Sequence, residues 1–117
     1  MSLYILDADH NAVPCSDTEK WAAWFGDVSN RRVALDDVPL GDGAWRVSTV
    51  FLGVDHSFGE GSPVLFETMV FRYTREHEKD GVWGDEALRF RTWDEALAGH
   101  ARRVASLREL VAALGRE

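Results

Sequence analysis

Five polar residues of this chain could carry chemistry, because they lie at the end of a strand-like run, inside one, or on an apolar helix stripe: Asp55, His56, Glu67, Thr68 and His100. Imidazole and carboxylate groups are the usual acid–base catalysts, and they often bind ligands as well. We expect these five residues to form one ligand-binding site, open to solvent between a hairpin and the C-terminal helix.

His100 has two interpretations. It lies on the apolar stripe of the expected last helix, next to Gly99, which removes a side chain and lets another group approach closely. It is either a core histidine hydrogen-bonded to a strand residue, or a group that faces a cleft between the helix and the hairpin.

Glu67 and the pair Asp55-His56 are equally open to two interpretations. Glu67 either meets a cation, or serves as a general base or metal ligand at a site. Asp55-His56 is either a turn-entry pair or part of a site, since strand ends and loops often carry function on a rigid scaffold. The cations that could pair with Glu67 are Arg46, Arg72, Arg89 and His100.

Templates for metal and covalent chemistry are missing from the sequence. Two imidazoles and a carboxylate could hold a divalent metal if His56, Glu67 and His100 converged. The chain nevertheless has no HExxH, no paired CxxC, no GxSxG and no phosphate-binding glycine motif. We therefore expect no metal and no cofactor, and we interpret the single cysteine, Cys15, as structural.

The elements that must position these residues begin with a long central hairpin. Val47–Val54 and Val64–Tyr73 are rich in β-branched and aromatic residues, and a segment rich in Gly and polar residues joins them. Both runs are apolar on both faces, which indicates a sheet covered on both sides or packed in a dimer. The flanking strands that we expect are Tyr4–Leu6, Ala12–Pro14, a strand within Arg32–Leu40, and 88–91, with a loop over Thr74–Glu86.

Two helices are expected. The first follows a capping box at Ser16–Glu19 and carries one apolar stripe, Trp21, Trp24, Phe25 and Val28, up to Ser29. The second follows a capping box at Thr92–Glu95 and runs to Gly115. Its stripe, spaced by three and four residues from Leu97 on, is Trp93, Leu97, His100, Val104, Leu107, Val111 and Leu114.

Composition bounds the class of protein. A chain of 117 residues, 45% hydrophobic, predicts a single domain over residues 1–117. The net charge is −7, with the excess almost wholly in residues 1–60, which disfavours nucleic-acid binding. No segment predicts a signal peptide or a membrane span, so we expect a cytoplasmic protein. The fold class that follows is α+β: a mostly antiparallel sheet of four to six strands with two helices, the C-terminal one packed on the sheet.

Three segments resemble a known group of proteins. The runs VSTVFLGVDHSF (47–58), LFETMVF (65–71) and TWDEALAGH (92–100) are similar to those of an uncharacterised family of small proteins encoded by phages, prophages and their bacterial hosts. The resemblance covers most of the chain apart from Thr74–Glu86. It implies a phage-linked setting in a bacterial host cell, where small acidic proteins often act by binding host factors, and it implies no particular chemistry.

Three functions are consistent with these patterns. The leading hypothesis is a non-enzymatic binding protein of phage type that engages a host protein, with counter-defence as one outcome. The second is a small-ligand protein, for instance a nucleotide-signal sponge, with its pocket at the interface of a homo-oligomer such as a homodimer. The third is an enzyme, metal-assisted or acid–base, that uses His56, Glu67 and His100.

Overall fold

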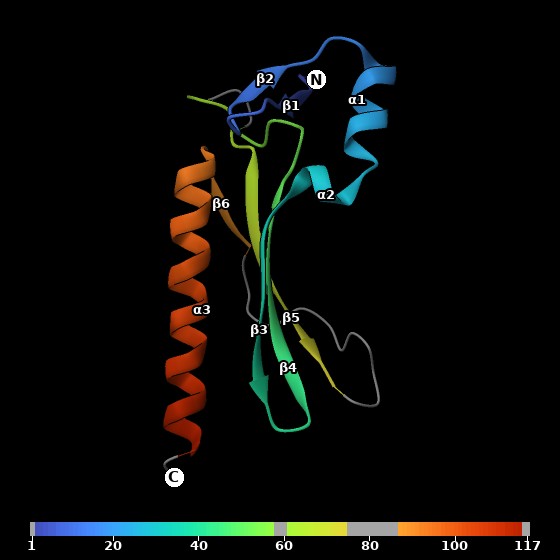
Figure 1. Ribbon diagram of the computed structural model, residues 1–117. Helices are drawn as coiled ribbons and strands as arrows, with labels where there is room; N and C mark the ends of the chain where they lie inside the picture. The colour runs from blue at the N-terminus through green and yellow to red at the C-terminus, as the bar shows by residue number, and fades with distance from the viewer. Residues whose placement is uncertain (1, 58–60, 75–86, 116–117) are drawn as a thin grey trace.

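The computed structural model describes residues 2–57, 61–74 and 87–115, and it confirms the α+β class. A two-stranded sheet and a four-stranded sheet are combined with one long and two short helices (Figure 1). In chain order the elements are β1 (Tyr4–Leu6), β2 (Ala12–Pro14), α1 (Thr18–Phe25), α2 (Val28–Arg31), β3 (Arg32–Leu40), β4 (Gly43–Phe51), β5 (Phe66–Tyr73), β6 (Leu88–Phe90) and α3 (Trp93–Gly115).

The larger sheet is antiparallel throughout, in the order β3-β4-β5-β6, and β4 pairs with β5 along its length. The predicted central hairpin is therefore confirmed. Its first strand ends at Phe51 rather than Val54, because the chain leaves the sheet at Gly53, whose φ of 72° favours glycine. From there the chain crosses to the smaller sheet, where the N–H of Tyr4 donates to the carbonyl of Gly53 at 2.9 Å.

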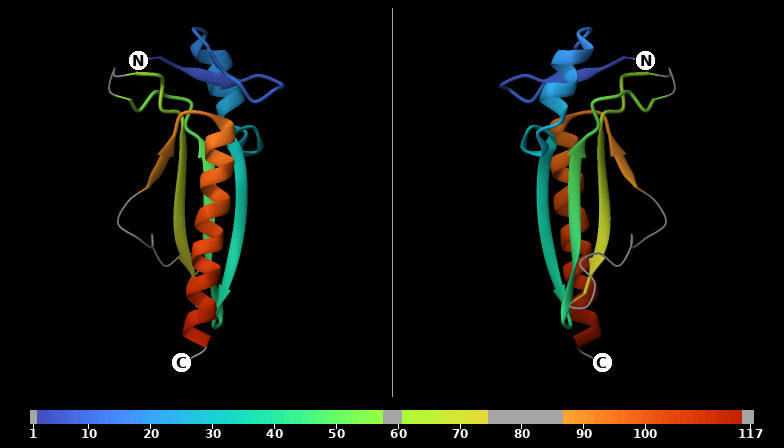
Figure 2. Two further views of the ribbon diagram at one scale, coloured as in Figure 1. Left: turned by 90° about the vertical axis from the view of Figure 1, so that its left-hand side faces the viewer. Right: turned by 90° about the vertical axis from the view of Figure 1, so that its right-hand side faces the viewer.

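Helix α3 lies along one face of the larger sheet, as predicted, and contacts all four of its strands (Figure 2). Its buried face consists of Ala96, Gly99, His100, Val104 and Leu107, whereas Leu97 and Leu114 are exposed. The predicted stripe is thus right at its centre and wrong at those two positions.

The core between α3 and the sheet has two apolar parts. The first, near the C-terminal half of α3, is formed by Val38, Trp45, Val47, Val70, Val104 and Leu107. The second, near its N-terminal end, is formed by Leu6, Phe51, Leu65, Phe66 and Ala96. Three buried polar residues, Thr49, Thr68 and His100, belong to neither part.

The first predicted helix is wrong in detail. It is broken into α1 and α2 at Gly26-Asp27, because the Asp27 carboxylate accepts from the N–H of Ser29 and starts a new helix. Val28 is therefore not on the stripe of α1. The N-cap of α1 is Asp17 rather than Ser16, since the Asp17 carboxylate accepts from two N–H groups of the first turn.

Two further expectations concern the loop at Thr74–Glu86 and membrane-spanning helices. Of the predicted loop Thr74–Glu86, all but Thr74 lies outside the described residues. Among the residues that the structure does describe, no helix combines the length and apolarity needed to cross a bilayer.

Candidate functional site

His100 lies in a buried chain of hydrogen bonds that joins α3 to three strands. Its Nδ1 is 2.7 Å from Thr49 Oγ1, and its Nε2 is 2.7 Å from Asp36 Oδ2. Thr49 Oγ1 is in turn 2.5 Å from Thr68 Oγ1. An ionised Asp36 makes Nε2 the donor, so Nδ1 accepts from the Thr49 hydroxyl, which accepts from Thr68. The polar side-chain atoms of Thr49, Thr68 and His100 then all have a hydrogen-bond partner.

The order hydroxyl, imidazole, carboxylate is that of a nucleophile with its base and its orienting acid. Burial argues against that use. The exposed fractions of Thr49, Thr68 and His100 are 0%, 2% and 4%, so no substrate carbonyl can reach the hydroxyl in this conformation. Only the Asp36 side chain, 46% exposed, contacts solvent. The arrangement fits the alternative of a core histidine bonded to strand residues, and it holds α3 in register on the sheet.

Glu67 does not lie near His100, because adjacent strand residues point to opposite faces of a sheet. Thr68 points toward α3, so Glu67 points toward the other face. There the Glu67 carboxylate accepts from the Arg89 guanidinium of β6 at 3.1 Å. The expectation that Glu67 lies beside the His100 imidazole is therefore wrong. Glu67 instead forms an ion pair, which was the alternative to a role in a site.

Asp55 and His56 stabilise the segment after β4. The N–H groups of Val64 and Ser57 donate to the Asp55 carboxylate and hold its pKa below the ordinary value. His56 Nδ1 is 2.8 Å from the carbonyl of Val54. Of the five predicted site residues, the structure joins only Thr68 and His100, through Thr49. Among the described side chains, no group of three or more His, Cys, Asp or Glu could hold a metal ion.

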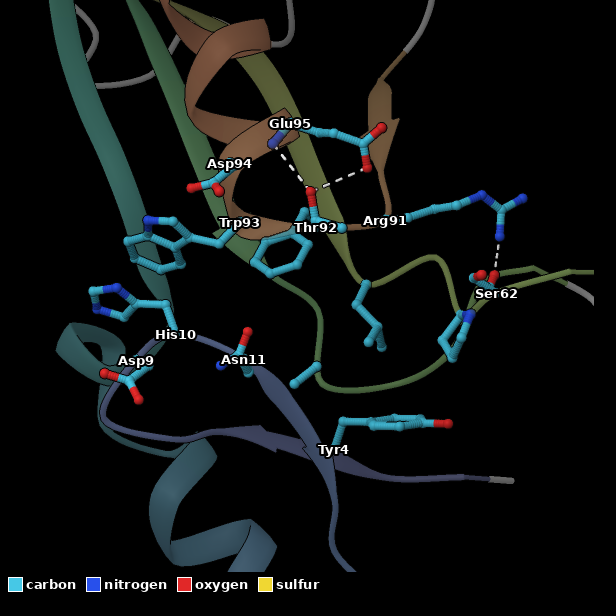
Figure 3. A pocket seen from close by; sticks show the side chains of 14 residues that line it. Tyr4, Asp9, His10, Asn11, Ser62, Arg91, Thr92, Trp93, Asp94 and Glu95 are labelled. Carbon is cyan, nitrogen blue, oxygen red and sulfur yellow. Dashed lines mark hydrogen bonds between the residues drawn. The ribbon is translucent and has the colours of Figure 1, made fainter.

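A different place in the molecule offers an open cavity of about 490 Å³, which lies between the N-terminal hairpin and the start of α3 (Figure 3). It is lined by Tyr4, Asp9, His10, Asn11, Ala12, Ser62, Pro63, Leu65, Phe66, Arg91, Thr92, Trp93, Asp94 and Glu95. None of the five predicted site residues lines it.

Local structure explains the walls of this cavity. The Asp7 carboxylate accepts from the N–H groups of Asp9 and Asn11 and so closes the turn between β1 and β2. That turn carries His10 with a φ of 64° and places its ring flat on Trp93, with centroids 3.8 Å apart and planes 7° apart. The stack lies at one end of the cavity, and Tyr4 forms part of the wall (Figure 3). Leu65 is among the other lining residues.

The capping box at the start of α3 forms part of the cavity wall. The Thr92 hydroxyl accepts from the N–H of Glu95 at 3.1 Å, which confirms the N-cap of the predicted box. The Glu95 carboxylate accepts from the Thr92 hydroxyl, also at 3.1 Å, rather than from the Thr92 N–H as the box would have it. Asp94 follows in the same first turn, where acidic residues are stabilised by the helix dipole.

Charge is distributed unevenly around the cavity. Three carboxylates line it, those of Asp9, Asp94 and Glu95, against one guanidinium, that of Arg91. Arg91 donates to the carbonyl of Ser62 at the opposite end from Asp9 and Asp94 (Figure 3). The cavity therefore favours a neutral or cationic guest over a phosphate-bearing one.

Sequence reasoning missed this cavity because its parts are far apart in the chain. The sequence predicts the Thr92–Glu95 box as local structure, and the Asp7–Asn11 turn lies between two predicted strands. They meet only because β1 docks across the end of the larger sheet, where Leu3 forms an isolated bridge with Val54. The histidine in the turn and the tryptophan in the box were the available signals.

Searches against protein-family models, curated proteins and solved structures find no match to this chain. The similarity to phage-encoded proteins is therefore a resemblance only.

Proposed function

We propose that this chain is a small-molecule-binding protein whose ligand occupies the cavity between the β1–β2 hairpin and the start of α3. The observation that carries the proposal is the cavity itself, about 490 Å³ with aromatic walls, within the range of ligand pockets. Its volume suits a molecule of roughly the size of a single or fused ring with a short substituent.

The ligand class follows from the walls and the charges. Tyr4 and Trp93, both half-buried, provide the apolar contact for a flat ring, since Leu65 and Phe66 are only 2% and 1% exposed. Asp94 makes no hydrogen bond or ion pair within the described part of the chain, and Asp9 uses only its backbone N–H. Both carboxylates remain available to a cation. The ligand class is therefore an aromatic amine rather than a nucleotide.

A titration followed by NMR tests this proposal. Phenethylamine and 3-phenylpropionate share a ring and a two-carbon chain and differ in the sign of their charge, and AMP serves as the nucleotide. The chain has five tryptophan indole N–H signals, and a Trp93→Phe variant assigns the one from the cavity. We expect phenethylamine to shift the Trp93 signal and leave that of Trp45, in the other part of the core, in place.

Charge dependence sharpens the test. We expect Asp94→Asn to weaken phenethylamine binding about two- to fivefold, because partly exposed ion pairs contribute roughly 0.5–1 kcal/mol. Glu109→Gln, an exposed acid near the far end of α3, is the matched control and should leave binding unchanged. Equal binding of phenylpropionate, a preference for AMP, or no shift of Trp93 with any of the three would overturn the proposal.

The host-protein and enzyme hypotheses remain predictions. Engagement of a host protein by a phage-type chain, with counter-defence as an outcome, needs a partner to be found by pull-down from a host lysate. The enzyme hypothesis loses its proposed machinery, since His100 contacts neither His56 nor Glu67 among the described residues.

A further inference from the structure

His10 is an exposed imidazole at one end of the ligand cavity. Its ring lies flat on the Trp93 indole, with centroids 3.8 Å apart. Neither ring nitrogen of His10 forms a hydrogen bond or an ion pair with any other described residue. Both nitrogens are therefore open to a proton from solvent or to a polar group of a bound molecule.

The position of this ring is fixed by contacts that do not involve its nitrogens. Trp93 is the first residue of α3, and its indole packs edge-on against the buried Phe66 ring, with planes 82° apart. On the other side of the stack, the backbone N–H of His10 donates to the carbonyl of Asp7 at 3.0 Å. The imidazole therefore stays at the end of the cavity in either protonation state.

The charges around His10 are mostly negative. His10 and Trp93 line the ligand cavity and also a second cavity of about 230 Å³. The charged side chains of these two cavities come from the β1–β2 turn, from β3 and from the start of α3: Asp7, Asp9, Arg32, Arg91, Asp94 and Glu95. Four carboxylates thus oppose two guanidinium groups, and this end of the molecule attracts cations.

Two of these carboxylates are available to a cation. Those of Asp7 and Glu95 already accept hydrogen bonds from the backbone or from Thr92. Asp9 and Asp94 have no such side-chain bonds, and both lie at the His10 end of the ligand cavity (Figure 3). They are also the carboxylates that the proposed function assigns to the ammonium group of the ligand.

We infer that a proton on His10 and the ammonium group of the ligand compete for the Asp9 and Asp94 end of the cavity, so that ligand binding is coupled to pH. This inference rests on the proposed function. A neutral imidazole leaves both carboxylates to the ammonium group and offers it a nitrogen lone pair. An imidazolium places a second positive charge beside the ammonium group and repels it. Binding is therefore strongest above the titration range of imidazole and weakens as the pH falls through that range.

Dissociation constants for phenethylamine at pH 8.0 and pH 5.5, from NMR titrations of the Trp93 indole signal, test the inference. These values bracket the ordinary titration range of imidazole, and the aliphatic amine is charged at both. We expect the wild type to bind about three- to fivefold more weakly at pH 5.5, the effect of a second positive charge about 5 Å away in largely aqueous surroundings.

Two variants locate the effect. His10→Asn keeps a residue type that tolerates the positive φ of this position, and it should bind phenethylamine equally at both pH values. His56→Asn, outside the cavity, should retain the dependence of the wild type. Circular dichroism establishes that each variant is folded at both pH values, and His10→Gly replaces His10→Asn if the latter is not.

The outcomes separate this inference from the proposed function. Equal wild-type dissociation constants at pH 8.0 and pH 5.5, or a dependence that persists in the folded His10 variant, would overturn the inference and leave the ligand site intact. No shift of the Trp93 signal at pH 8.0 would overturn the proposed function and the inference together.

Discussion

Replacement of His100 by alanine measures whether the buried hydrogen-bond chain holds α3 on the sheet. The variant removes the contacts of the imidazole with Thr49 and Asp36 and leaves a gap between the two apolar parts of the core. The bond to Thr49 is fully buried and contributes about 1 kcal/mol. The bond to Asp36 has a charged acceptor, but the exposure of that side chain limits its contribution to about 1–1.5 kcal/mol.

The gap left by the ring adds a packing loss. Truncation of a buried side chain to alanine costs about 2 kcal/mol or more when the site cannot collapse, and here the neighbouring Thr49 and Thr68 belong to the rigid centre of the sheet. Together these effects predict a loss of about 3–5 kcal/mol in the free energy of unfolding. A small domain has a total of about 5–15 kcal/mol, so we expect the variant to be folded and measurable.

Urea unfolding followed by circular dichroism is the assay, with the midpoint lowered and the slope unchanged. Ser106→Ala, on the exposed side of the same helix, is the control and should change stability by less than about 0.5 kcal/mol. A loss below about 1 kcal/mol for His100→Ala would refute the structural role and reopen the interpretation of His100 as a site residue.

Two further predictions concern packing and acid stability. Gly99→Ala should lower the free energy of unfolding by about 1–2 kcal/mol, because a Cβ there would lie 2.5 Å from Phe90 Cε1. In a Phe90→Ala background the same substitution should raise the free energy of unfolding by up to about 1 kcal/mol through helix propensity. Urea midpoints of the wild type, the two single variants and the double variant test this prediction, and stabilisation by Gly99→Ala alone would contradict it. The Asp55 pKa is lowered in the folded state, so its ionised form contributes stability above the unfolded pKa near 3.8 and loses it as pH falls through the lower folded value. Asp55→Asn should therefore be less stable than the wild type at pH 6, with a difference that narrows below pH 4 in thermal unfolding scans; a constant difference from pH 6 to pH 2.5 would exclude this linkage.

Local patterns were enough to predict most of the fold. The apolar runs of β4 and β5 are long and rich in β-branched residues, and the box at Thr92–Glu95 has the reciprocal side chains that start a helix. Each of these patterns involves residues that are only a few positions apart, so it can be recognised in the sequence. The break between α1 and α2 was missed because a hydrophobic stripe continues across it, while the deciding group is the Asp27 carboxylate.

The site was predicted less well, because it depends on which face of each strand meets α3. In β5 both faces are apolar, so the pattern does not say whether Glu67 or Thr68 points toward the helix. That choice is made by the pairing of Thr68 with Thr49 and by the docking of His100 against Thr49. The cavity depends on a longer-range event still, the crossing of β1 over the end of the larger sheet.

The most direct test of the proposed ligand site is a map of backbone and indole chemical shifts during titration with phenethylamine. We predict that the largest changes fall on Tyr4, His10 and Trp93, around the cavity at the start of α3. Changes centred instead on Thr49, Thr68 and His100 would show that the buried chain opens to ligands, and they would contradict the assignment of the site to the cavity.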